Sequence, residues 1–287
     1  MKNKKQITVI IPVYNCKNYL AECFDSVINQ TIGLDKLDVI IIDDGSTDGS
    51  DEVIKEYKKQ YPEWKVISQK NAGLAAARNA ALEHLKTEYV CFFDSDDILP
   101  KTALSNLLKS AEKNKSDIVI GGMENFTSTG HRPNYTTKYL KHFDQISYKK
   151  YIHLLDFVHA CGKLYRVSII KNKRFIAGTK HEDNYFTLSL YLSTDKISMV
   201  NKTVYRRRDR EGNDKSIMQS LDFNSFKDLL TNYDKALDEN DYDEKVLKFL
   251  TRKICHYIFK NLSKKDWSKA IYLANVFGKK YRREKIR

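Results

Sequence analysis

Three carboxylates crowd into the stretch "CFFDSDDILP", residues 91–100, where their mutual repulsion costs stability unless something offsets it. In an extended segment, side chains two positions apart point the same way, so Asp94 and Asp96 are expected on one face. Ser95 and Asp97 then share the other face. Two carboxylates that converge at a strand end favour a hard divalent ion, Mg²⁺ or Mn²⁺, which completes its shell with water and substrate phosphates. Asp96 is the predicted metal ligand.

Helix capping is the alternative role for some of these polar groups. Asp97 precedes "ILPKTALSNLL" and is expected to cap the helix that starts there. In "DDGSTDGS", a structural cap by Asp48 or Ser50 is favoured over a ligand contact, whereas Gly45 permits a tight turn and a close backbone approach. The stretch matches neither G-x-G-x-x-G nor the P-loop pattern, which argues against a dinucleotide or simple ATPase site.

The elements that must position these residues are short apolar runs. Five β-branched runs, at 7–13, 37–43, 65–68, 88–94 and 116–122, alternate with helical patterns at 18–30, 50–57 and 74–85. The runs lack polar alternation, as parallel strands covered on both faces do, and the order predicts a doubly wound α/β sheet. Ligands bind such sheets at the carboxyl ends of the strands, where the strand order reverses. The motifs "PVYN", "DDGSTDGS", "QKNAG" and "DSDD" each follow a run, which predicts one site there.

Length and composition suit one large domain with an appendage. The chain has 287 residues, of which 41% are hydrophobic and 30% charged, enough to bury a core. The strand pattern loosens after about residue 123, and the chain becomes helical after Leu221. We therefore expect a catalytic domain over 1–218 and a basic helical region over 219–287. Five scattered cysteines without a CxxC pair favour a reducing cytosol.

The formal net charge is +13, and the span 241–287 has 14 Lys or Arg against 5 Asp or Glu. Nucleic acid, an anionic membrane or an anionic polymer are candidate partners, and a solvated basic surface fits as well. Known nucleic-acid-binding patterns are missing from the sequence, so no nucleic acid is expected. No apolar run approaches the roughly 18 residues of a membrane helix. The predicted location is the cytoplasm, with peripheral attachment to the inner face of the cell membrane.

Taken together, the motifs resemble family-2 glycosyltransferases with the GT-A fold. The similarity rests on "VIIPVYNCKNYLAECFDSVINQT", "DVIIIDDGSTDGS", "QKNAGLAAARNAAL" and "YVCFFDSDD", and more weakly on "CGKLYR" and "HEDNYF". It covers roughly residues 6–217. The resemblance implies a Rossmann-like, mostly parallel sheet and an inverting transfer of a sugar from a nucleotide diphosphate, usually uridine diphosphate (UDP), to an acceptor hydroxyl. The implied acceptor is a glycan, a lipid-linked intermediate or an anionic polymer in cell-surface polysaccharide synthesis.

The resemblance also implies roles for individual residues. On the nucleotide side, Pro12 and Tyr14 line the nucleobase and ribose, Asp44 holds the nucleobase, and Asn71 and Arg78 approach the uracil and diphosphate. Asp94 with Ser95 lies by the ribose and donor sugar, and Asp96 binds the metal. Asp183 is the general base that accepts the proton, and Glu182 is its neighbour. From the residues alone, Arg78 could equally pair with a core carboxylate. Glu182 and Asp183 also suit the first turn of a helix. The basic stretch "YRRRDREGNDKSI" resembles a loop that closes over the diphosphate.

The sequence departs from the family pattern in two places, and two alternative functions stay open. Cys161 or Gly162 stands where the family often has Trp, so a different acceptor-side platform is expected. The sequence does not single out which of the arginines at 206–210 reaches a phosphate. The alternatives are a nucleic-acid- or polyanion-binding protein and a degenerate transferase that only binds carbohydrate. Intact Asp96 and Asp183 argue against the degenerate form.

Overall fold

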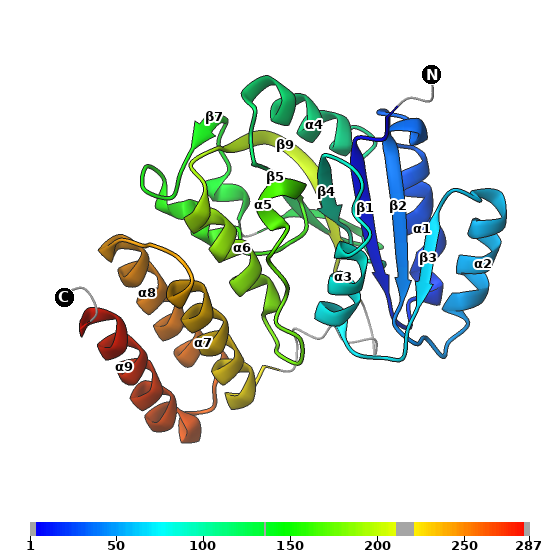
Figure 1. Cartoon of the computed structure of the whole chain (residues 1–287). Helices are drawn as coiled ribbons and strands as arrows, with labels where there is room; N and C mark the ends of the chain where they lie inside the picture. The colour runs from blue at the N-terminus through cyan, green and yellow to red at the C-terminus, as the bar shows by residue number, and fades with distance from the viewer. Residues whose placement is uncertain (1–3, 135, 211–220, 284–287) are drawn as a thin grey trace.

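The computed structural model describes residues 4–134, 136–210 and 221–283 (Figure 1). The strands are β1 (Ile7–Val13), β2 (Leu37–Asp43), β3 (Lys65–Ser68), β4 (Tyr89–Phe92), β5 (Ile118–Thr127), β6 (Gly130–Pro133), β7 (Phe143–Ile146), β8 (Lys163–Arg166) and β9 (Ile197–Arg208). The helices are α1 (Lys17–Ile28), α2 (Ser50–Gln60), α3 (Leu74–Leu82), α4 (Ala103–Asn114), α5 (Val167–Ile170), α6 (Glu182–Ser193), α7 (Phe223–Asp238), α8 (Glu244–Asn261) and α9 (Trp267–Arg283). All five predicted strand runs form strands, although the fourth ends early, at Phe92, and the fifth continues to Thr127.

The strands form one sheet in the order β3-β2-β1-β4-β8-β5-β9-β7, with β6 paired to β5. β1, β2, β3 and β4 are parallel to one another, and β5 is parallel to β9. β8 runs antiparallel between β4 and β5 and joins the two parallel parts. All seven residues of β1 are buried, as expected for a central strand covered on both faces. The doubly wound α/β prediction is confirmed.

The order of the strands reverses between β1 and β4. The chain passes from β1 through α1 and α2 to β3 in one direction, and α3 then carries it back to β4 on the other side of β1. Because such crossovers are right-handed, α3 lies on the opposite face of the sheet from α1 and α2 (Figure 1). The carboxyl ends of β1 and β4 are therefore the place where a ligand is expected.

Helices α7, α8 and α9 form a layer beside α6, away from the parallel strands (Figure 1). A reciprocal capping box starts α7, in which the Asp222 carboxylate accepts from Ser225 N at 2.8 Å. Buried Phe226, Leu229 and Tyr233 form the apolar face of α7. The C-terminal region is thus helical, as predicted, but the proposed boundary at 218 lies outside the described residues and stays a prediction. None of the described helices is long and apolar enough to span a bilayer.

Strands β5 and β9 approach closely where their register shifts, between Ile120 and Met123. A Cβ atom on Gly121 would lie 2.2 Å from Val204 Cγ2, and one on Gly122 would lie 3.0 Å from the Lys202 carbonyl oxygen. Only glycine allows this approach without displacing β9. The contact matters for function because the carboxyl end of β9 carries arginines to the DSDD segment.

Gly121→Ala is expected to lower the free energy of unfolding by about 1–3 kcal/mol, since the branched Val204 side chain has no room to yield. Gly278→Ala in α9 is the matched control. Its added Cβ meets no atom within 4 Å, and alanine is favoured over glycine inside a helix by about 0.5–1 kcal/mol. Urea denaturation measures both; unchanged stability in Gly121→Ala would contradict the close β5–β9 packing.

Candidate functional site

The chain turns immediately after β4, so the DSDD segment is not extended. Asp97 N donates to the Asp94 carbonyl oxygen at 3.2 Å, which closes a turn over these four residues. The expectation that Asp94 and Asp96 share a face is therefore wrong, because strict alternation holds only in extended backbone. The Asp94 carboxylate pairs with Arg78 at 3.0 Å, and the Asp96 carboxylate pairs with Arg210 at 2.8 Å.

Asp97 is not a helix cap, contrary to prediction. α4 starts at Ala103 with Thr102 as its N-cap, and Asp97 is buried. Its carboxylate accepts from Tyr205 Oη at 2.5 Å and from Arg208 N at 2.7 Å. Burial raises the pKa of Asp97 well above its usual range, and the charges of Asp96 and Asp94 add to this. Asp97 therefore fastens the end of β9 to the DSDD turn.

Arg78 is the buried centre of the site. Its side chain is 1% exposed and lies over the Phe175 ring, 5.2 Å from the ring centroid. One guanidinium nitrogen, Nη1, lies 3.0 Å from Glu182 Oε1 and 2.5 Å from Asp183 Oδ1, while Nη2 pairs with Asp94. Of its two sequence interpretations, the pairing with carboxylates is the one present here. Its contact with a donor diphosphate stays a prediction.

Glu182 and Asp183 form the first turn of α6, which confirms the helix-start interpretation of this pair; the general-base role stays a prediction. His181 precedes them in a left-handed conformation, with φ 62°, and sets the angle at which α6 starts. Asp183 Oδ2 accepts from Ala160 N at 3.0 Å, so both oxygens of this carboxylate are held. Burial raises the pKa of Glu182 to about 7, and the neighbouring Asp183 charge contributes next.

The end of β2 brings two further predicted residues together. Buried Asp44 accepts from Ala72 N at 2.9 Å and from Gly73 N at 2.8 Å, and Asn71 Nδ2 donates to the Asp44 carbonyl oxygen at 3.1 Å. Gly45, with φ +76°, is needed because a Cβ there would lie 2.9 Å from Asn71 N. The close backbone approach predicted at Gly45 is therefore made to Asn71 of the same chain. Gly49 is the N-cap residue of α2, so neither Asp48 nor Ser50 holds that position, but Asp48 accepts from Ser50 N at 2.9 Å and so contacts the first residue of the helix.

The remaining predicted residues lie at the ends of β1 and β4. Pro12 is buried within β1, Tyr14 just beyond it is 50% exposed, and Ser95 is buried in the DSDD turn. Of these three side chains, Tyr14 is thus the accessible one. Their contacts with a nucleotide stay predictions.

Two basic residues, one at the end of β9 and one just after it, reach the DSDD turn. Arg208 Nε donates to the Asp96 carbonyl oxygen at 2.8 Å, and its guanidinium lies 4.4 Å from the Phe126 ring centroid. Arg210 pairs with the Asp96 carboxylate and also lies over Tyr19. Arg206 instead pairs with Glu124 on β5. The rest of the predicted basic loop, 211–217, lies outside the described residues.

The Asp96 carboxylate would fit a metal ion whose other ligands come from water and substrate phosphates. Within the described ranges, no three His, Cys, Asp or Glu side chains converge as a ready-made metal site. Mg²⁺ commonly uses only one or two carboxylates together with substrate phosphates, so a full protein cage is not required. Asp96 is 22% exposed, unlike buried Asp97, and can supply such a carboxylate.

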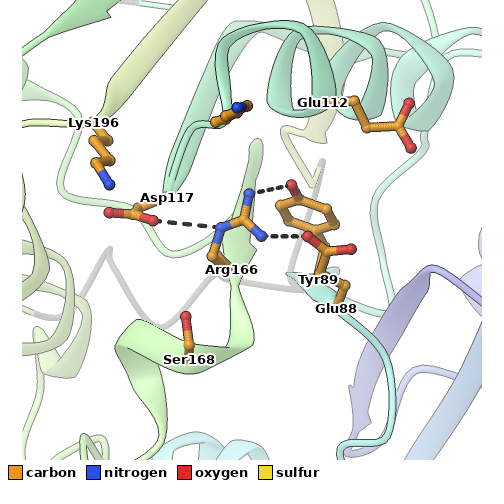
Figure 2. Close-up of a pocket in the computed structure, with 8 residues that line it drawn as sticks. Glu88, Tyr89, Glu112, Asp117, Arg166, Ser168 and Lys196 are labelled. Atoms are coloured by element: carbon orange, nitrogen blue, oxygen red, sulfur yellow. Dashed lines mark hydrogen bonds and ion pairs between the residues drawn. The ribbon is translucent and has the colours of Figure 1, made fainter.

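A separate pocket lies near the amino end of β4, at the other end of the parallel strands from this site. Figure 2 shows it around Arg166, next to Glu88, Tyr89 and Asp117. Arg166 Nη2 donates to Tyr89 Oη at 2.6 Å, and its Nε lies 3.4 Å from an Asp117 oxygen. These contacts tie the amino end of β4 to β8, and the polar groups largely satisfy one another.

Replacing Glu182 with Gln tests the electrostatics of the site. Since the pKa of Glu182 is raised from its ordinary value to about 7, its stabilising contribution is complete below pH 4.5 and is lost as the pH rises through 7. The wild type should therefore lose unfolding free energy relative to Glu182→Gln between pH 5 and pH 8. Urea denaturation at both pH values gives this difference. A relative gain by the wild type would mean that Arg78 dominates and lowers the pKa of Glu182.

Comparison with known proteins finds glycosyltransferases among the relatives of this chain. Glycosyltransferase GlyA of Streptococcus pneumoniae is 34% identical over 217 residues, which are 72% of this chain and 31% of that protein. A poly(ribitol-phosphate) beta-glucosyltransferase of Bacillus spizizenii is 32% identical over 68% of this chain and 31% of its own length. The chain thus spans about a third of the length of these curated relatives.

Two solved structures share the fold. TarS 1-349 from S. aureus, in complex with UDP-GlcNAc, has a TM-score of 0.77 at 24% identity and covers 92% of this chain and 79% of its own. Mannosyltransferase PcManGT from Pyrobaculum calidifontis, in complex with GDP-Man and Mn²⁺, has a TM-score of 0.63 at 17% identity and covers 96% of this chain and 74% of its own. The profile of Glycosyl transferase family 2 matches residues 8–173, more than half of the sequence, and the chain belongs to that family.

Proposed function

We propose that this chain is the catalytic part of an inverting glycosyltransferase that moves a sugar from a UDP-sugar to a hydroxyl of a cell-surface glycopolymer. The observation that carries the proposal is that Arg78 joins Asp94, at the end of β4, to Asp183, at the start of α6. Asp94, the proposed contact of the donor sugar, and Asp183, the proposed base, are thereby held by one guanidinium. UDP-GlcNAc in the TarS structure supports the choice of donor class.

Asp183 is the proposed general base. Each carboxylate oxygen has two lone pairs, so after Arg78 and Ala160 N are satisfied one remains on each oxygen. An acceptor hydroxyl within about 2.6–3.2 Å of Asp183 can therefore give up its proton as the new bond forms. A single base on the face opposite the leaving group produces inversion of the anomeric carbon.

The leaving UDP develops negative charge that the site must stabilise. A Mg²⁺ or Mn²⁺ ion held by Asp96 would supply Lewis-acid stabilisation of that charge. Of the cations on this side, Arg210 is 16% exposed and already lies at Asp96, whereas Arg78 is 1% exposed. We assign the diphosphate contact from the basic segment to Arg210. Arg208 anchors the segment on Phe126 and the DSDD backbone.

The acceptor is proposed to be an anionic polymer or a lipid-linked precursor of one. The chain carries a formal charge of +13, and its relative from Bacillus spizizenii is named for poly(ribitol-phosphate). Long-range electrostatic attraction would draw a polyanion to a protein of this net charge.

Asp96→Ala should abolish metal-dependent binding of UDP, whereas Asp183→Asn should keep UDP binding and lose transfer by a factor of about 10² or more, because only the proton acceptor is removed. UDP binding with and without Mn²⁺ is measured by calorimetry. Transfer is measured as UDP release in a screen of nucleotide sugars.

Asp195→Asn is the control for these variants, because Asp195 is exposed just before β9, at the far edge of the sheet. It should bind UDP and turn over like the wild type. Normal transfer by Asp183→Asn would overturn the base assignment. Failure of every donor in the screen would favour a carbohydrate-binding protein without turnover.

Helices α8 and α9 offer a surface suited to an anionic membrane. Four large apolar side chains, between 41% and 68% exposed, lie there among exposed lysines: Phe259, Ile271, Tyr272 and Val276, with Lys260, Lys269 and Lys279. In α9 these residues share one face of the helix. Apolar residues flanked by lysines are typical of helices that lie in the membrane interface. We infer peripheral attachment to the inner leaflet through this surface.

Lys269→Glu should weaken binding to phosphatidylglycerol vesicles by about tenfold or more, since each basic residue near such a surface contributes about 1 kcal/mol. Lys59→Glu, which reverses an exposed charge on α2, should bind like the wild type. Cosedimentation at low and high salt measures both. Equal sedimentation with phosphatidylglycerol and with neutral phosphatidylcholine would exclude the attachment.

A further inference from the structure

The segment 159–161 supplies one of the two contacts that hold the proposed base. Ala160 N donates to Asp183 Oδ2 at 3.0 Å, and Arg78 holds the other oxygen. The orientation of the Asp183 carboxylate therefore depends on the orientation of the peptide between His159 and Ala160. A side chain that fixes this peptide therefore also fixes the orientation of the proposed base, Asp183.

Two side chains of β8 hold the carbonyl groups of this segment. Tyr165 Oη donates to the Ala160 carbonyl oxygen at 3.0 Å, and Lys163 Nζ donates to the carbonyl oxygens of His159 and Cys161, the latter at 3.4 Å. Lys163 and Tyr165 are two positions apart on a strand, so both point to the same side. All three successive carbonyls are thus held by β8, which leaves the Ala160 N–H directed at Asp183.

Lys163 is an unusual residue to find in such a place. It is 2% exposed, and in the described part of the chain its hydrogen-bond acceptors are carbonyl oxygens rather than a carboxylate. Burial lowers the pKa of Lys163 to about 7, while the nearby Asp183 charge opposes this. Burying an ammonium group is costly, so its retention needs a compensating role. A methionine of similar length would fill the space without that cost.

We propose that Lys163 is a positioning residue for the base, which acts by locking the 159–161 peptides so that Ala160 N stays on Asp183. The inference rests on the proposed function of Asp183. Without Lys163, the carbonyl oxygens of His159 and Cys161 lose their contacts with Nζ. Tyr165 still holds the Ala160 carbonyl and Cys161 stays bridged to Phe92, so the change is expected in the tilt of the peptide between His159 and Ala160. Asp183 then keeps its bond to Arg78 but loses the second contact that fixes the plane of its carboxylate.

Lys163→Met is the main test, and Tyr165→Phe, which removes one hydroxyl and keeps the ring, is the second variant in case the first does not fold. In crystals of each variant with UDP and Mn²⁺, the distance from Ala160 N to Asp183 Oδ2 should lengthen beyond hydrogen-bond range. With the donor selected by the nucleotide-sugar screen, kcat should fall by about tenfold or more in Lys163→Met and less in Tyr165→Phe. KM for the donor and the Kd of UDP should stay within about twofold of the wild type.

Tyr281→Phe controls for the general loss of a buried hydroxyl, because Tyr281 in α9 bonds to Asp234 in α7, away from the site. It should leave kcat unchanged. An unchanged Ala160–Asp183 contact in Lys163→Met would overturn the positioning role whatever the rates. Weaker UDP binding in step with kcat would also overturn it, because a general structural defect would explain both. A displaced amide with unchanged kcat would also overturn the positioning role if Asp183→Asn has lost transfer, because the base then works without the Ala160 contact. If Asp183→Asn retains transfer as well, the proposed function of Asp183 fails instead.

Discussion

The site depends on one buried guanidinium. Arg78 comes from α3, on one face of the sheet, and its carboxylate partners come from the turn after β4 and from the start of α6, 16, 104 and 105 positions along the chain. The rings of Phe92 and Phe175 lie beside it and exclude water, which strengthens each ion pair. Removal of Arg78 would take the same cation from Asp94, Glu182 and Asp183, so this one side chain links the carboxylate after β4 to the proposed base.

The same constraint explains how three aspartates tolerate one another in four positions. The turn after β4 separates their carboxylates: Asp94 points to buried Arg78, and Asp97 is held by Tyr205 and the backbone of Arg208. The Asp96 carboxylate faces Arg210 instead. The repulsion is thus offset within the protein by groups from α3 and β9. Asp94 and Asp96 are both partly exposed, at 34% and 22%, and the one that is not paired with buried Arg78 is the one assigned to the metal.

The strands and the edge at which the site lies follow from sequence because they rest on local pattern. Runs such as 7–13 and 37–43 are buried on both faces, so their apolar composition alone identifies them as strands. The polar motifs that follow them lie at the carboxyl ends of the strands, where the strand order reverses. Asp97 was assigned wrongly because its partners, Tyr205 and Arg208, lie more than 100 positions away. Lys163 lies in the weakly matching stretch "CGKLYR", but nothing local linked it or Ala160 to Asp183, since these contacts arise only when β8 is inserted between β4 and β5. For Arg78 the sequence left two charge partners open, and only the fold brings the carboxylates to it.

The central claim is that Arg78 keeps Asp94 and Asp183 together while the donor is bound. A crystal structure of the chain with UDP and Mn²⁺ tests this most directly. We expect the ion at Asp96, the diphosphate near Arg210, and the guanidinium of Arg78 still bonded to Asp94 and Asp183. An Arg78 side chain that has left Asp183 to contact the diphosphate would contradict the account, because the base would then be positioned without it.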